Sequence, residues 1–127
     1  MTLDPKSFTI SVTDKITGEL VRGAFKVKTR LSWRDQLARE RIRLDLLGPL
    51  AAQASVRARE QADLVSELAV RIVEAPQFWK EADNGLDLQD DAIMVEVFNE
   101  AIKAEAEAIA ALKKLGEEAK VELAKIG

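Results

Sequence analysis

The sequence predicts a mainly α-helical protein of 127 residues with an N-terminal β-hairpin. Residues 7–13 and 21–30 alternate apolar and polar side chains with the period of two that is typical of a half-buried strand. Residues 32–127 mostly repeat apolar side chains at helical spacing and are rich in Ala, Glu and Lys, which are strong helix formers. We therefore expect a single domain over residues 1–127, with the hairpin in 1–31 and three to four helices in 32–127.

The hairpin is predicted from two alternating segments and a connecting turn. In the first segment, Ser and Thr alternate with Phe8, Ile10 and Val12. In the second, one face carries Val21, Gly23, Phe25, Val27 and Thr29. Residues 14–19, which include Gly18, form a plausible turn between them. Because an isolated hairpin is marginal in water, we expect this one to pack on the helices or to pair with another chain.

Two helices are predicted next from their capping and stop residues. The first begins after the N-cap Ser32, with Asp35 in its first turn, and ends at Gly48-Pro49. Its apolar positions are Trp33, Leu37, Leu44 and Leu47. The second helix is expected from about Ala51 to Ala75 and is closed by Pro76. Its apolar stripe comprises Leu64, Val65, Leu68, Ala69, Ile72 and Val73.

The last third of the chain is predicted as a loop followed by the longest helix. Residues 77–89 are loop-like and contain the turn dipeptide Asn84-Gly85. The helix that follows Asp90-Asp91 has a heptad-like stripe of Val95, Phe98, Ile102, Ile109 and Leu112. Gly116 is expected to break or bend this helix, which leaves a short terminal helix over residues 117–126.

Composition and motifs argue against an enzyme. The chain has no Cys, His or Tyr, so it lacks cysteine nucleophiles, thiolate zinc sites and the commonest general base. Phosphate-binding glycine loops and the GxSxG motif are absent as well. The acidic residues Asp83, Asp87, Asp90 and Asp91 fail the calcium-loop pattern, and the last two are better explained as helix caps. We therefore expect no catalytic residues, no metal and no cofactor.

Charge is distributed unevenly along the chain. Residues 1–59 carry 12 Lys and Arg against 6 Asp and Glu, whereas residues 60–127 carry 7 against 16. This division favours head-to-tail self-association, so we expect a homo-oligomer, although ordinary solvated faces would show the same charges. The basic residues from Arg22 to Arg43 make nucleic acid a rival partner. An aromatic content of only 5% and the negative net charge disfavour it.

No apolar stretch reaches the length needed to cross a bilayer, and the first six residues include Asp4 and Pro5 where a secretory signal needs basic and then apolar residues. We therefore expect a cytosolic protein with no membrane contact.

Six apolar residues are candidates for contacting another protein. Trp33, Phe78 and Trp79 are bulky aromatics outside the predicted core stripes. They are either interface anchors or side chains that cover the core between helices. Phe98, Ile102 and Ile109 lie on the stripe of the last helix. That stripe, or the seam between it and residues 64–73, is predicted to hold an amphipathic helix of a partner.

Two stretches resemble the tail assembly chaperones of long-tailed bacteriophages. They are FKVKTRLSWRDQL at residues 25–37 and VRIVEAPQFW at 70–79, the latter running on through GLDL at 85–88. The similarity is one of overall pattern and extends over residues 20–107. Members of this family are generally small, helix-rich and not enzymes, and they are often made in two lengths by a translational frameshift.

The resemblance implies a role in phage tail morphogenesis in the host cytoplasm. The chain would bind the long helical tape measure protein and recruit subunits of the major tail protein before the tail tube polymerises. Two alternatives remain open from the sequence: a structural virion protein such as a connector or tail subunit, and a small nucleic-acid-binding regulator.

Overall fold

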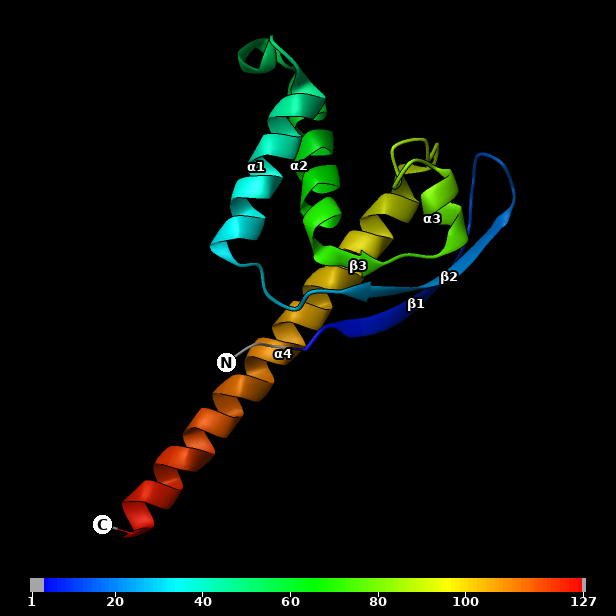
Figure 1. Cartoon of the computed structure of the whole chain (residues 1–127). Helices are drawn as coiled ribbons and strands as arrows, with labels where there is room; N and C mark the ends of the chain where they lie inside the picture. The colour runs from blue at the N-terminus through cyan, green and yellow to red at the C-terminus, as the bar shows by residue number, and fades with distance from the viewer. Residues whose placement is uncertain (1–3, 127) are drawn as a thin grey trace.

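The structure, a computed structural model, describes residues 4–126 and confirms the mainly α-helical fold with an N-terminal hairpin (Figure 1). Residues 1–3, part of the segment read above for an export signal, lie outside this description. The strands β1 (Lys6–Thr13) and β2 (Leu20–Val27) form the predicted antiparallel hairpin, with Phe8 opposite Phe25. Its turn holds Gly18 at φ +77°. One sheet face is buried and the other carries exposed Ser and Thr side chains, as the alternation predicts.

The first predicted helix is confirmed as α1 (Trp33–Leu47). Ser32 and Asp35 form a capping box, in which the Asp35 N–H donates to Ser32 Oγ at 3.1 Å and the Ser32 N–H donates to Asp35 Oδ2 at 2.9 Å. Lys28 Nζ also contacts Asp35 Oδ1 at 2.7 Å and fixes the start of the helix beside the end of β2. This hydrogen bond with Lys28 and that from the Ser32 backbone lower the pKa of the Asp35 carboxyl.

The second helix is shorter than predicted at both ends. Residues Ala51–Gln53 form a 3-10 turn (η1), and Ser55 caps α2, which runs over Val56–Arg71. Residues Ile72–Glu74 form the strand β3, which pairs with β2 and gives the sheet order β1-β2-β3. The prediction of helix through Ala75 was wrong because the β-branched residues Ile72 and Val73 and the following Pro76 favour extended backbone, and β2 offers them an edge to pair with.

The predicted loop contains a short helix, and the last helix is not interrupted. Residues Gln77–Glu81 form α3 directly after Pro76. Turns over residues 82–90 follow, in which Asp83, Asn84 and Gly85 all have positive φ. The helix α4 (Asp91–Ile126) continues through Gly116, so the predicted break there was wrong. Its Ala-, Glu- and Lys-rich surroundings are strong enough helix formers to offset the roughly 1 kcal/mol that an exposed glycine costs.

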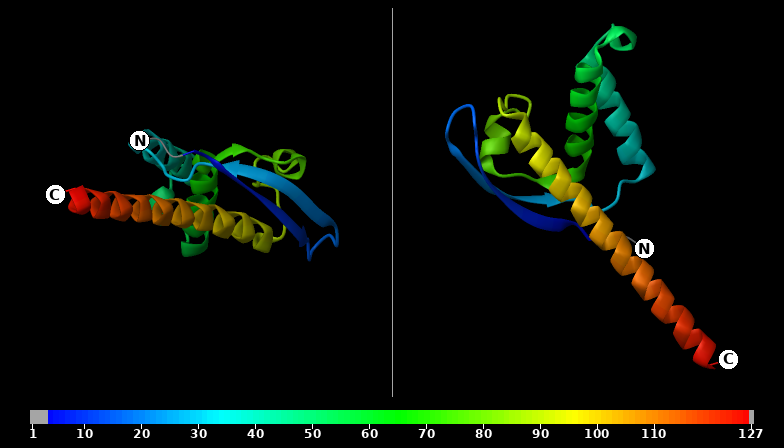
Figure 2. Two further views of the ribbon diagram at one scale, coloured as in Figure 1. Left: turned by 90° about the horizontal axis from the view of Figure 1, so that it is seen from below. Right: turned by 180° about the vertical axis from the view of Figure 1, so that it is seen from behind.

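The core lies between the sheet, α2, α3 and the first half of α4. In α4 the buried residues are Ile93, Met94, Val97, Ala101, Ala104 and Ala108. This face is adjacent to the predicted stripe of Val95, Phe98 and Ile102. The alanines explain this correction, because their small side chains let the helix approach the sheet closely. The α1–α2 hairpin projects from α4 on one side and the sheet lies on another, while the second half of α4 extends away from both (Figures 1 and 2).

An aromatic cluster joins these elements. Phe25 stacks on Phe8 with ring centroids 5.4 Å apart and meets Phe78 and Trp79 edge-to-face at 5.9 and 5.4 Å. Trp79 in turn lies over Gly85, where no Cβ could be accommodated. The contact holds α3 and the turns before α4 beneath the sheet.

Replacing Gly85 by alanine is expected to lower the free energy of unfolding by about 1–3 kcal/mol more than replacing Gly18 does. Both residues have positive φ, +91° and +77°, so alanine is strained at both. A Cβ at position 85 would lie 2.7 Å from Trp79 Cη2, whereas one at position 18 meets nothing within 4 Å. Urea denaturation of the two variants measures the difference, and equal losses would contradict tight packing around Trp79.

Candidate functional site

A groove lies between the first half of α2 and the start of α4. It consists of two adjoining hollows of about 490 and 480 Å³ that share Glu60 and Leu64 of α2. Apolar side chains line much of the first hollow: Leu64, Val65, Leu86, Leu88, Met94 and Val95. The second hollow lies toward α1 and adds Phe98. Each volume falls in the range of a typical ligand pocket and can take one or two large side chains.

The rim of the groove is acidic. Six carboxylates and three arginines line the two hollows, which gives the groove a net charge of −3: Glu40, Glu60, Asp63, Glu67, Asp90 and Asp91 against Arg39, Arg43 and Arg57. Across the first hollow, Arg57 Nη2 lies 3.4 Å from Asp91 Oδ2. Both side chains are more than 70% exposed, so solvent screens this pair and it does little to hold the groove closed.

Asp90 has a structural role at the edge of the groove. Its carboxylate accepts the backbone N–H of Lys15 at 2.9 Å and that of Ala92 at 3.0 Å. These two hydrogen bonds lower the pKa of the Asp90 carboxyl, and they tie the β1–β2 turn to the start of α4. The prediction that this residue caps the helix is thereby confirmed.

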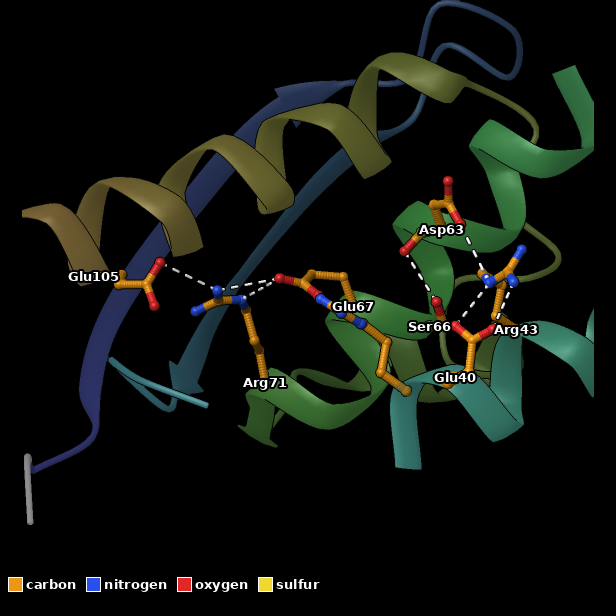
Figure 3. A network of polar contacts seen from close by, with 8 residues as sticks. Glu40, Arg43, Asp63, Ser66, Glu67, Arg71 and Glu105 are labelled. Atoms are coloured by element: carbon orange, nitrogen blue, oxygen red, sulfur yellow. Dashed lines mark hydrogen bonds and ion pairs between the residues drawn. The ribbon is translucent and has the colours of Figure 1, made fainter. Parts of the chain in front are cut away.

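A network of ion pairs joins the helices that form the groove (Figure 3). Arg71 of α2 is buried and its Nη2 lies 3.1 Å from Glu67 Oε1 and 3.2 Å from Glu105 Oε2 of α4. Glu67 also accepts a hydrogen bond from Arg39 of α1 at 2.7 Å. The network therefore joins three helices at the end of α2 that is closest to α4. Toward the start of α2 the two helices diverge (Figure 1).

A second part of the network holds α1 against α2. Arg43 Nη2 of α1 lies 2.6 Å from Glu40 Oε1, and its Nε lies 3.7 Å from Asp63 Oδ1 of α2. The hydrogen bond between Arg43 and Glu40 lowers the pKa of the Glu40 carboxyl and raises that of the guanidinium. Among the described residues, the pairs Lys6–Glu107, Arg39–Glu67, Arg43–Asp63 and Arg57–Asp91 join the basic first half of the chain to the acidic second half. Some of the opposite charges of the two halves are thus paired within one molecule.

Two of the predicted partner-binding aromatics belong to the core. Trp79 is only 2% exposed, so its assignment as an interface anchor was wrong. Phe78 is partly buried and packs against the same core cluster, edge-on to Phe25. Both residues follow Pro76 on the short helix α3, which turns them toward the sheet instead of toward solvent. Their spacing in a segment predicted as a loop gave no sign of that helix.

The other four candidates differ in their exposure. Trp33 is 86% exposed at the start of α1, so it does not cover the core, as one reading of the sequence supposed. Phe98 lines the groove and Ile102 is partly buried one turn further along α4. Ile109 lies beyond the last buried residue of α4 and is 44% exposed. The structure thus brings only Phe98 of the predicted set into the groove.

The wall of the groove that is formed by the start of α4 and the turns before it was largely not predicted from the sequence. Leu86 and Leu88 come from the turns before α4, and Met94 and Val95 come from its first turn. Only Val95 was on the predicted stripe. The alternation Gly85-Leu86-Asp87-Leu88 after a turn dipeptide is the one signal that could have indicated two apolar side chains on a common side.

Comparison with protein-family models, curated proteins and solved structures gives no match to this chain. Within residues 4–126, no three acidic side chains gather as they must to hold a metal ion. None of the helices described is both long enough and apolar enough to span a bilayer. The groove and the exposed surfaces of the chain are therefore the features that bear on its function.

Replacing Arg71 by alanine is expected to lower the free energy of unfolding by about 3 kcal/mol or more, because it leaves the carboxylates of Glu67 and Glu105 without their buried counter-ion. The matched control is Arg57→Ala, which breaks the exposed pair with Asp91 and should change stability by less than about 0.5 kcal/mol. Urea denaturation at neutral pH measures both. Equal effects of the two variants would contradict the role of Arg71 in joining the helices.

Proposed function

We propose that this protein is a non-enzymatic tail assembly chaperone of a long-tailed bacteriophage, and that the groove between α2 and α4 binds a helix of the tape measure protein. The observation that carries the proposal is the groove itself, which has apolar walls and an acidic rim. One wall includes Leu86 and Leu88, which belong to a stretch that resembles this family. The resemblance and the groove support the same kind of partner.

An amphipathic helix suits such a groove. Side chains at positions i and i+4 of a helix lie on one face and are about 6 Å apart, so two of them can enter adjoining hollows. Leu64 lies between the two hollows and can contact both. Lysine or arginine beside the apolar stripe of the client would face the acidic rim, which favours the correct orientation and rapid association.

Binding of this kind explains how a chaperone could keep a long helical client soluble. The client's apolar stripe would be covered segment by segment, which removes the surface through which such helices aggregate. Exposed apolar side chains on α1 and on the projecting half of α4 would remain available to subunits of the major tail protein. Leu37 and Leu123, for example, are 73% and 69% exposed.

Two alternative functions differ from the chaperone role in what experiment would show. A structural virion protein, such as a connector or tail subunit, would be present in stoichiometric amounts in purified particles, whereas a chaperone would be absent. A nucleic-acid-binding regulator would bind DNA with a steep dependence on salt. Several of the basic side chains that such a regulator would need, including Arg39 and Arg43, are instead paired with carboxylates of α2 or of α1 itself.

Substituting lysine for Leu86 or Val95 is expected to weaken binding of the tape measure protein by more than tenfold, because each variant places a charge in an apolar wall of the groove. These side chains are 47% and 45% exposed, so the fold should tolerate the change. The matched control is Val73→Lys on the edge strand β3, at a residue that is 48% exposed and lies outside the groove.

The measurement is calorimetric titration of each variant with a soluble helical segment of the tape measure protein, after circular dichroism has shown an unchanged fold. Loss of affinity in the groove variants alone supports the assignment. If all three variants bind like the parent, the groove is not the client site. If the parent protein does not bind the segment at all, or stays in finished particles, the chaperone role is wrong.

A further inference from the structure

The outward face of α1 is apolar and has no partner among the described residues. Trp33, Leu37 and Leu44 are 86%, 73% and 46% exposed, and none of the residues of α1 is buried. Their spacing places all three on one side of the helix, opposite the side that packs on α2. An exposed tryptophan within such a stripe is unusual for a surface that only meets water, since Trp is the residue most enriched at the centres of interfaces.

Cations accompany this apolar face. Arg34 and Arg41 are exposed, and the structure gives neither an ion pair within residues 4–126. In the helix they lie beside the stripe of Trp33, Leu37 and Leu44. Arg39 and Arg43 contrast with them, because both point toward α2 and are paired with carboxylates. The outward face of α1 is therefore apolar, with Arg34 and Arg41 along one edge and the carboxylate of Asp45 beyond them.

The groove is complementary to this face in chemistry and in size. It is apolar at its walls, carries a net charge of −3, and its first hollow of about 490 Å³ is large enough for an indole ring. Glu60 on its rim has no ion pair among the described residues. Trp33 is not among the residues that line the groove of its own chain, to which α1 contributes only Arg39, Glu40 and Arg43.

We propose that α1 of a second copy of this chain docks in the groove, with its Trp33 in the first hollow and its arginines against the rim carboxylates. Such an interface is heterologous, because each molecule offers one helix face and one groove, so it generates chains of molecules or a ring. The client helix and the second copy would compete for one site. Self-association then shields the groove until a client arrives. The inference rests on the groove of the proposed function but not on the identity of the client.

The test uses full-length variants at exposed positions. Trp33→Glu removes the helix face and Val95→Lys removes the groove, and sedimentation should show that each lowers the association constant more than tenfold. Ile16→Glu, at a residue 64% exposed in the hairpin turn, is the matched control and should associate like the parent.

Tryptophan fluorescence gives a second measurement of association, because Trp79 is already buried in the monomer. A blue shift of the emission as the parent is concentrated therefore reports burial of Trp33. The shift should be absent in Trp33→Phe, whose remaining tryptophan, Trp79, is buried at every concentration.

Mixing the two variants that no longer self-associate tests whether the helix face of one molecule binds the groove of another. Trp33→Glu keeps an intact groove and Val95→Lys keeps an intact helix face, so an equimolar mixture should form a dimer that cannot extend. A strictly monomeric parent, or a mixture that stays monomeric while the parent associates, would overturn the proposal. The two proposals fail separately: Trp33→Glu should bind the tape measure segment at least as well as the parent, because it lacks only the competitor for the groove.

Discussion

The contact of Trp79 with Phe25 above it and Gly85 below it is the constraint on which the rest of the structure depends. It holds the short helix α3 under the sheet and brings the turns after it back toward α4. Those turns place Leu86 and Leu88 in one wall of the groove, and they place Asp90 where it caps α4 and binds the β1–β2 turn. A Cβ at position 85 would lie 2.7 Å from the indole, so a larger residue there would displace Trp79 or the turns that form one wall of the groove.

The groove forms because the two ends of α2 differ in how many contacts hold them against the rest of the fold. At its C-terminal end, the buried residues Leu68 and Arg71 join it to the sheet and to α4, and β3 follows without a break. At its N-terminal end it is supported mainly by α1, which contributes no buried side chain. A helix held at one end diverges from its neighbour, and the side chains between them stay accessible. The same weak support leaves the N-terminal end of α2 and the helix α1 with few constraints on their position relative to α4.

Sequence patterns predicted the elements with local signals and missed those that depend on distant contacts. The Ser32 capping box and the alternating strands are local, and both occur as expected. The strand β3 needs the edge of β2, and the burial of Trp79 needs a sheet above it, so neither can be read from neighbouring residues. The buried face of α4 was missed for a related reason. Alanines give little hydrophobic signal, yet Ala101 is fully buried because a small residue permits close approach to the sheet.

The division of charge along the chain acquires a physical interpretation from the groove. Within one molecule, Arg39, Arg43 and Arg57 from the basic half already pair with carboxylates of the acidic half, and this assembles the groove walls. Glu60, which lines both hollows, is a carboxylate of the groove that has no ion pair among the described residues. Of the basic residues left over, Arg34 and Arg41 lie on the outward face of α1. A groove with apolar walls and carboxylates beside them would favour basic amphipathic helices in general, so in our proposals a client helix and a second copy of the chain compete for it.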